Sequence, residues 1–366
     1  MPDDLRKIVF QIMSNVEYNP NLVFTIRIFT LSDSQITHHI HDRKIDFATI
    51  IDLVRDDMRA TDVLIEEQLH SEVALINQVS CYIVHSGGKR LRPLLVLLGD
   101  HAFGHGSRQR IALAAIIEFI HTATLLHDDV VDSSDLRRGH ETANTLWGNE
   151  ASVLVGDFLY SRSFQMMVKV GNPRIMEIFA ETTNMIAEGE VMQLLNCNEP
   201  ETTEERYLEV IRAKTAKLFE AAAQMGAVIH GRSREEQRAM ALFGLHMGTA
   251  YQLVDDVLDY RGEIDVIGKN IGDDIAEGKP TLPLIYAMRV GEESQASIIR
   301  AAVREGKREK IQDIIRIVES TGAITYTAAA ARAAADLALQ TLETIPPSRY
   351  RDALGALVEF SVSRAY

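Results

Sequence analysis

The sequence predicts an all-α protein built as one large helical domain, and three observations support this prediction. From Ile45 onward, apolar residues recur at three- and four-residue spacing in segment after segment, which is the period of an amphipathic helix. Proline and glycine stand between these segments rather than inside them. The 366 residues, 46% of them hydrophobic, supply a large core. This length would allow two domains, but large helical domains reach the same size, so we expect one.

The helices are expected at about 46–69, 71–86, 91–103, 108–131, 142–169, 173–196, 203–230, 234–260 and 281–291, with shorter ones toward the C-terminus. Residues 301–315 are predicted to form a solvated helix pair, and the alanine-rich residues 326–340 a packing helix. Residues 1–44 differ, because they are rich in β-branched residues and have no clear helical period. We expect them to be a poorly ordered N-terminal extension. Their acidic residues Asp3, Asp4 and Glu17 disfavour a transit peptide.

Composition excludes several classes of protein. The net charge is −14, from 38 basic and 52 acidic residues, which argues against nucleic acid as the main partner. Only two cysteines are present, Cys81 and Cys197, too few for a disulfide framework or a thiolate zinc site. We find no secretory signal and expect no segment that spans a membrane. The sequence therefore predicts a soluble cytoplasmic protein.

A first acidic cluster, DDVVD, ends the apolar helix predicted at 108–131. Asp128 and Asp132 point the same way one turn apart, and Asp129 lies to one side. Carboxylates this close repel one another unless cations sit between them, and Mg²⁺ is commonly held by one or two carboxylates together with substrate phosphates. Taken alone, the pattern is also common as a solvated helix end.

A second cluster, DDVLD, repeats the spacing at Asp255, Asp256 and Asp259 after another apolar helix. Two such clusters facing each other would form a metal-lined cleft for a diphosphate, with basic side chains completing its charge balance. Basic residues follow both clusters and a glycine pair, namely Arg137, Arg138, Lys269, Lys279, Lys89, Arg90 and Arg92. The glycine pair is not a nucleotide-binding loop, because the Walker pattern is absent. The motifs of serine hydrolases and zinc proteases are absent as well.

At these residues the sequence resembles the trans-type polyprenyl diphosphate synthases, and within them the long-chain branch represented by bacterial octaprenyl diphosphate synthase. The resemblance runs from about Ile45 to the C-terminus. Its motifs occur in the family's order: GGKRLRP, FIHTATLLHDDVVD, LRRG, SVLVGDFLYSRSFQMM, IAEGEVMQL, KTAKLFEAAA, GTAYQLVDDVLDY and GKNIGDDIAEGKPTLPL. It implies a helical bundle of the isoprenoid synthase type with a central active-site cleft, and it makes residues 45–366 the catalytic domain.

The resemblance also implies a role for each site residue. The isopentenyl diphosphate would be held by Lys89, Arg92, His121 and Arg138, and the allylic diphosphate by Arg137, Lys214, Thr215, Gln252 and Lys269. Mg²⁺ would be held by Asp128, Asp132 and Asp255, with Asp129, Asp256 and Asp259 as the remaining catalytic acids. Without the resemblance, His121 would be interpreted as a core histidine, and Lys214 and Gln252 as ordinary polar residues of a helix. The implied reaction extends an allylic diphosphate by one trans isoprene unit.

The residues before the first cluster bear on product length. Ala123 and Thr124 are small, so no aromatic ring blocks a tunnel for the growing chain near the metals. Ile120 and Ile117 continue this face, and the eight positions from Ile120 to Asp128 cover about 12 Å. The floor is expected deeper, at Met167 or Phe164. A long product is predicted, and octaprenyl follows from the resemblance alone.

Some alternatives stay open at this point. Other product lengths, from hexaprenyl to decaprenyl, fit the same residues. A terpene cyclase also ionises an allylic diphosphate, but it usually has a different second metal motif. A non-catalytic partner subunit typically loses one acidic cluster, whereas both are intact here. The resemblance further implies a homodimer whose product is delivered to the membrane as the side chain of a quinone such as ubiquinone.

Overall fold

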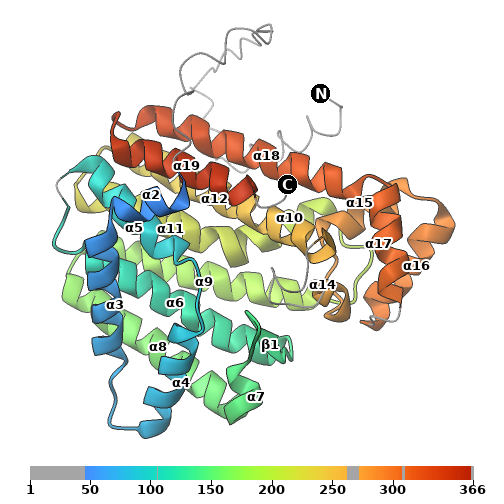
Figure 1. Ribbon diagram of the computed structural model, residues 1–366, viewed down its shortest axis with the longest axis horizontal. Helices are drawn as coiled ribbons and strands as arrows, with labels where there is room; N and C mark the ends of the chain where they lie inside the picture. The colour runs from blue at the N-terminus through green and yellow to red at the C-terminus, as the bar shows by residue number, and fades with distance from the viewer. Residues whose placement is uncertain (1–45, 105, 262–271, 307–309, 364–366) are drawn as a thin grey trace, which may run out of the picture.

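The protein is described here from a computed structural model that covers residues 46–104, 106–261, 272–306 and 310–363 (Figure 1). The N-terminal extension predicted at 1–44 lies outside the described residues. The first part of the chain forms α2 (Phe47–Asp52), α3 (Arg55–Leu69), α4 (Ala74–His85), α5 (Leu91–Phe103), α6 (Arg110–Val131), a hairpin of β1 (Leu136–Arg137) and β2 (His140–Glu141), α7 (Ala143–Trp147), α8 (Asn149–Val170) and α9 (Pro173–Asn196). The predicted all-α class is confirmed.

The second part of the chain forms α10 (Glu204–Ile211), the π-helix η1 (Arg212–Ala216), α11 (Lys217–Ile229), α12 (Arg234–Arg261), α14 (Asp273–Ala276), α15 (Leu282–Val290), α16 (Glu293–Glu305), α17 (Ile311–Ser320), α18 (Ala323–Thr341), the 3₁₀ turn η3 (Leu342–Thr344) and α19 (Arg349–Ser363). The predicted helix pair at 301–315 corresponds to the end of α16 and the start of α17. The alanine-rich helix is α18, whose buried residues are mostly alanines that pack against the core.

Three predicted helices are divided in the structure. The helix expected at 46–69 is interrupted at Leu53 and Val54. The helix expected at 142–169 is divided at Gly148, whose φ of 88° lies in the region that favours glycine. The helix expected at 203–230 contains the π-helix η1, where one extra residue per turn changes the direction of the side chains.

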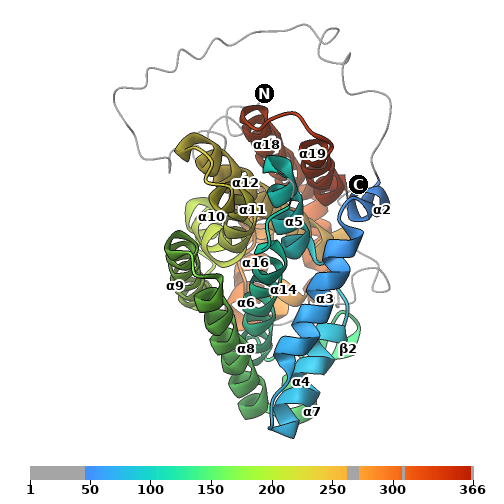
Figure 2. The ribbon, with the colours of Figure 1, turned by 90° about the vertical axis from the view of Figure 1, so that its left-hand side faces the viewer.

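The central helix of the bundle is α6, and Figure 2 shows α8 and α9 on one side of it and α3 on the other. Eleven of its residues are buried, among them Phe119 and Ile120. Among the described residues, α6 is the one helix long and apolar enough to cross a membrane by length and composition, although no such segment was expected from the sequence. In the structure, 56% of its apolar window is buried inside the protein, as in a core helix.

The helices pack most closely where glycine residues allow their backbones to come into contact. A Cβ on Gly226 of α11 would lie 2.3 Å from the carbonyl carbon and oxygen of Gly99 in α5. On the other side of the same helix, a Cβ on Gly244 of α12 would lie 2.3 Å from the carbonyl oxygen of Phe219. These contacts fix α11 between α5 and α12. They also determine where η1, directly before α11, meets α12.

Candidate active site

A cleft of about 370 Å³ is lined by residues of α6, α9, α10, η1 and α12. It brings both acidic clusters together with basic residues from several parts of the chain. The predicted site residues that line it are Arg92, His121, Thr124, Asp128, Asp132, Arg137, Arg138, Lys214, Thr215, Gln252, Asp255 and Asp256. Lys89, Ala123, Asp129, Asp259 and Met167 are described but are not part of this lining. Lys269 lies outside the described residues.

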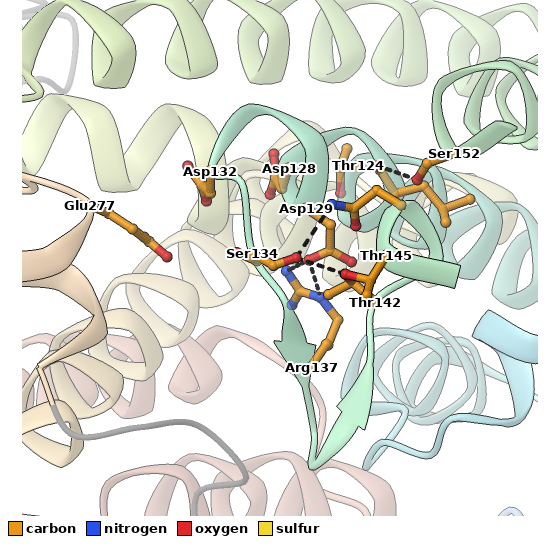
Figure 3. A network of polar contacts seen from close by, with 12 residues as sticks. Thr124, Asp128, Asp129, Asp132, Ser134, Arg137, Thr142, Thr145, Ser152 and Glu277 are labelled. Atoms are coloured by element: carbon orange, nitrogen blue, oxygen red, sulfur yellow. Dashed lines mark hydrogen bonds and ion pairs between the residues drawn. The ribbon is translucent and has the colours of Figure 1, made fainter. Parts of the chain in front are cut away.

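The first acidic cluster occupies the C-terminal end of α6. Figure 3 shows Asp128 and Asp132 side by side, with Asp129 turned toward Arg137. Asp129 is fully buried, and its Oδ1 accepts a hydrogen bond of 2.7 Å from Nε of Arg137. The same oxygen forms an ion pair of 2.6 Å with Nη2 of Arg137. This ion pair fastens the β1–β2 hairpin to α6, so that Arg137 lines the cleft beside the cluster.

Two lysines face the carboxylates that point into the cleft. Nζ of Lys279 is 2.8 Å from Oδ2 of Asp132 and 2.5 Å from Oε2 of Glu277. Nζ of Lys214 is 3.5 Å from Oδ2 of Asp128 and 2.6 Å from Oε2 of Glu190. Burial alone would lower the pKa of each lysine, but the carboxylates outweigh it and raise both pKa values. Both ammonium groups are therefore charged at neutral pH and offset the repulsion of the acids.

Glu190 and Glu277 belong to the site, although neither was predicted to do so. Glu190 comes from α9, and burial together with the Asp128 charge raises its pKa to about 7. Its Oε1 is buried without a hydrogen-bond partner. Burial also raises the pKa of Glu277. Both glutamates lie within motifs quoted for the family resemblance, IAEGEVMQL and GKNIGDDIAEGKPTLPL, and this was the signal available in the sequence.

The second acidic cluster lies near the end of α12. Asp255 lines the cleft, while Asp256 is almost fully buried and accepts hydrogen bonds from Tyr207 and Gln252. Burial, with the charge of Asp274 adding to it, raises the pKa of Asp256 to about 8. Both adjacent acids line the cleft, but Asp256 is the one whose oxygens are engaged by Tyr207 and Gln252.

The π-helix η1 places Lys214 and Thr215 in the cleft. It runs in close contact with its neighbours, because a Cβ on Gly189 of α9 would lie 2.7 Å from the backbone nitrogen of Lys214. A Cβ on Gly248 of α12 would lie 2.6 Å from Cα of Ala216. The hydroxyl of Thr215 reaches α12, where it donates to Oε1 of Gln252 at 3.0 Å. The glycines therefore allow the approach that brings these side chains together.

A group of basic residues lies around His121 on α6. A guanidinium nitrogen of Arg92 is 3.1 Å from Nε2 of His121, and the Arg92 guanidinium lies 4.3 Å from the centre of the Phe219 ring. Burial and the charge of Arg92 hold the pKa of His121 well below its ordinary value, so the ring is neutral and its Nε2 accepts this hydrogen bond.

Arg138 approaches the glycine pair of GGKRLRP. A Cβ on Gly88 would lie 2.6 Å from the Arg138 guanidinium, and Gly88 has a φ of 132°, so a side chain here would be strained as well as crowded. Lys89 is exposed, and its Nζ lies 4.9 Å from the centre of the Phe360 ring in α19. Of the basic residues assigned to isopentenyl diphosphate, the cleft thus contains Arg92 and Arg138.

The carboxylates of the cleft are suitable ligands for Mg²⁺. Within the described residues, however, no three or more His, Cys, Asp or Glu side chains are arranged so that they could hold a metal by themselves. Carboxylate oxygens are the protein ligands that Mg²⁺ prefers, and it usually takes one or two of them together with phosphates and water. Asp128, Asp132 and Asp255 line one cleft, so a diphosphate there could complete the coordination. The arrangement therefore fits a metal that enters together with its anionic substrate.

The fold and this cleft define a helical enzyme that handles diphosphates, and comparison with known proteins identifies its class. The chain belongs to the polyprenyl synthetase family, whose model matches residues 73–320. The octaprenyl diphosphate synthase of Escherichia coli (strain K12) is 48% identical to it, over 86% of this chain and 98% of that protein. The predicted family and the prenyl transferase activity are confirmed.

Solved structures agree. A polyprenyl synthase from Caulobacter crescentus CB15, crystallised with calcium and isoprenyl diphosphate, superposes with a TM-score of 0.85 at 40% identity, covering 89% of this chain and all of that one. A decaprenyl diphosphate synthase from Rhodobacter capsulatus gives a TM-score of 0.83 at 41% identity, covering 88% of this chain and all of that one. Relatives of similar identity thus carry names for different product lengths.

Proposed function

We propose that this chain is an octaprenyl diphosphate synthase that uses Mg²⁺ to add isopentenyl diphosphate repeatedly to an allylic primer such as farnesyl diphosphate. The observation that carries the proposal is one cleft lined by Asp128 and Asp132 at the end of α6, Asp255 of α12 and two sets of basic and polar residues. The octaprenyl length is supported by 48% identity to the E. coli enzyme. We further place the protein in the cytoplasm and assign its product to a quinone side chain.

The two sets of basic and polar residues would separate the two substrates. One set lies at the start of α5, on α6 and in the turn between β1 and β2, and it consists of Arg92, His121 and Arg138. We assign this set to isopentenyl diphosphate. Lys89 would join this group by swinging from its exposed position over Phe360.

The other set lies on η1 and α12 and consists of Lys214, Thr215 and Gln252. Together with Arg137, and with Lys269 outside the described residues, it would hold the allylic diphosphate. Asp128, Asp132 and Asp255 would hold Mg²⁺, which draws electron density from the diphosphate and makes it a better leaving group.

The residues of the chain would then act by position and charge. The carbon–oxygen bond of the bound allylic diphosphate breaks, and the basic side chains around Lys214 stabilise the pyrophosphate that leaves. The isopentenyl double bond, aligned by the Arg92 group, attacks the allylic cation and forms the new carbon–carbon bond. The released pyrophosphate would accept the proton that is lost, which leaves a trans product one isoprene unit longer.

The direct test is to incubate the purified chain alone with farnesyl diphosphate, labelled isopentenyl diphosphate and Mg²⁺, and to determine the product by mass spectrometry. Octaprenyl diphosphate is expected. A product of another length, from hexaprenyl to decaprenyl, would refute only the assigned length. A lack of any extended product would favour a non-catalytic partner subunit, and a cyclic hydrocarbon would favour a terpene cyclase.

We propose that the growing chain runs along α6 toward α8. Thr124 lines the cleft, and Ala123, Ile120 and Ile117 are fully buried on the same helix. On α8, Met167 is almost fully buried and the ring of Phe164 lies against that of Tyr160 at 5.7 Å between centroids. These residues are our candidates for the wall and floor of the tunnel.

Enlarging Ala123 is expected to shorten the product. The series Ala123→Val, Ala123→Leu and Ala123→Tyr should yield progressively shorter prenyl diphosphates with turnover retained, because the larger side chains obstruct the tunnel without touching the diphosphates. Chromatography of the dephosphorylated products measures the lengths. Ala123→Ser serves as the size-matched control and should leave the product unchanged. The same product distribution throughout the series would contradict the position of the tunnel wall.

We also propose that the protein is a homodimer joined through α8 and α9. Both helices lie on one side of the bundle (Figure 2). They carry apolar side chains that are more than half exposed, namely Leu154, Val168, Val191, Leu194 and Leu195. Exposed apolar patches of this kind commonly mark protein interfaces, and a twofold interface would cover the same face on both subunits.

Light scattering after gel filtration tests the dimer. The wild-type chain, with a mass of 40.9 kDa, is expected at twice that mass, and the double variant Leu194→Glu/Leu195→Glu at the single mass, because charges at an apolar interface are costly to bury. Val63→Glu, at an exposed apolar residue of α3, is the control and should remain dimeric. A monomeric wild type, or a double variant that stays dimeric, would rule out this interface.

A further inference from the structure

Tyr207 of α10 makes a hydrogen bond to which the roles assigned above give no function. Its hydroxyl donates a short hydrogen bond to Oδ2 of Asp256 on α12. The ring of Tyr207 belongs to the hydrophobic core, and both side chains are buried. A buried carboxylate requires partners for its oxygens, and Tyr207 supplies one of them from a different helix.

The other oxygen of Asp256 continues the connection. Oδ1 accepts a hydrogen bond of 2.9 Å from the side-chain nitrogen of Gln252, one turn earlier on α12. Oε1 of Gln252 in turn accepts the bond of 3.0 Å from the hydroxyl of Thr215 on η1. Three successive hydrogen bonds therefore link α10, α12 and η1, and all four residues of this chain of hydrogen bonds line the cleft.

This chain of hydrogen bonds determines which way the Gln252 amide points. A primary amide has two N–H donors and one oxygen acceptor. The oxygen is engaged by Thr215 and one N–H by Asp256, so the second N–H is available for an anion in the cleft. A reversed amide would turn its oxygen toward Oδ1 of Asp256, and both the hydrogen bond to Oδ1 and the one accepted from Thr215 would be lost. Asp256 thus orients Gln252, and Tyr207 holds Asp256.

We propose that Tyr207 is a positioning residue for the allylic diphosphate, acting through Asp256 and Gln252. This inference rests on the proposed function, which assigns Gln252 and Thr215 to that substrate. Without the Tyr207 hydroxyl, Asp256 can rotate toward other donors, and Gln252 loses the fixed direction of its free N–H. The isopentenyl group around Arg92 is separate from this chain of hydrogen bonds and is unaffected.

Tyr207→Phe tests the proposal, because it removes the hydroxyl and keeps the buried ring. The expected result is a rise of about tenfold in the KM for farnesyl diphosphate, the size of effect that loss of a hydrogen bond in a charged network produces. The KM for isopentenyl diphosphate and kcat should stay within about twofold, as for an interaction made equally in ground and transition states. Calorimetric titration with the unreactive thiolo analogue of farnesyl diphosphate should show the same loss of affinity.

Tyr326→Phe is the matched control. Tyr326 is also a buried tyrosine, and its hydroxyl donates to Glu204 at 3.1 Å, the first residue of the same helix α10. The variant removes a buried hydroxyl–carboxylate bond and loosens the start of α10 without touching Asp256. Its KM values for both substrates should equal those of the wild type. A rise in the farnesyl KM equal to that of Tyr207→Phe would reduce Tyr207 to a structural role and overturn the proposal.

A second variant tests the other end of the chain of hydrogen bonds that runs from Tyr207 through Asp256 to Gln252. Gln252→Ala should produce the same selective loss of farnesyl affinity, and adding Tyr207→Phe to it should cause little further loss, because residues that act in series are not additive. If the two substitutions raise the farnesyl KM independently, or if either single variant leaves it unchanged, the proposed coupling of Tyr207 to Gln252 is refuted. If Tyr207→Phe fails to unfold cooperatively on heating, Gln252→Ala alone decides. A wild-type chain that does not bind the farnesyl analogue at all would instead refute the proposed function.

Discussion

Mutual repulsion of carboxylates in one cleft is the constraint on which the arrangement of this protein depends. Asp128, Asp132 and Asp255 line the same space, and without cations their charges would drive α6 and α12 apart. Lys214 and Lys279 lie against the acids of α6, and each lysine also contacts a glutamate from another segment. The two lysines therefore offset part of the repulsion between the acids at the end of α6.

Close packing is what allows the charged groups to meet. The glycines at 189 and 248 let α9 and α12 approach η1 at backbone distance, and the π-helix turns Lys214 and Thr215 into the cleft. Asp129 has a different function from its neighbours, because its ion pair with Arg137 fastens the β1–β2 hairpin to the end of α6. The same five-residue motif thus supplies two carboxylates to the cleft and one to the scaffold.

Much of this could be predicted from sequence because the signals are local. Helical periodicity located α6 and α12, and the repeated spacing of aspartates placed Asp128 and Asp132 on one side of a helix and Asp129 on another. Strands of two residues and a π-helix carry no period, so the hairpin and η1 were missed. Tyr207 could not be found, because its contact depends on a helix distant in sequence; Tyr207 and Asp256 are 49 residues apart. Glu190 lies in a motif of the family resemblance, but its contact with Lys214 depends on a different helix and carries no local signal.

We propose that the acidic clusters hold metal ions that bind together with a diphosphate. Calorimetric titration of inorganic pyrophosphate into the full chain, with Mg²⁺ or with a chelator, distinguishes this arrangement from a cleft that needs no metal. Binding is expected with Mg²⁺, with an affinity at least about tenfold lower with the chelator and a similar loss in Asp128→Asn, because Asp128 would be one of the carboxylates that hold the metal. Equal affinity with and without Mg²⁺ would rule out a shared metal and diphosphate site.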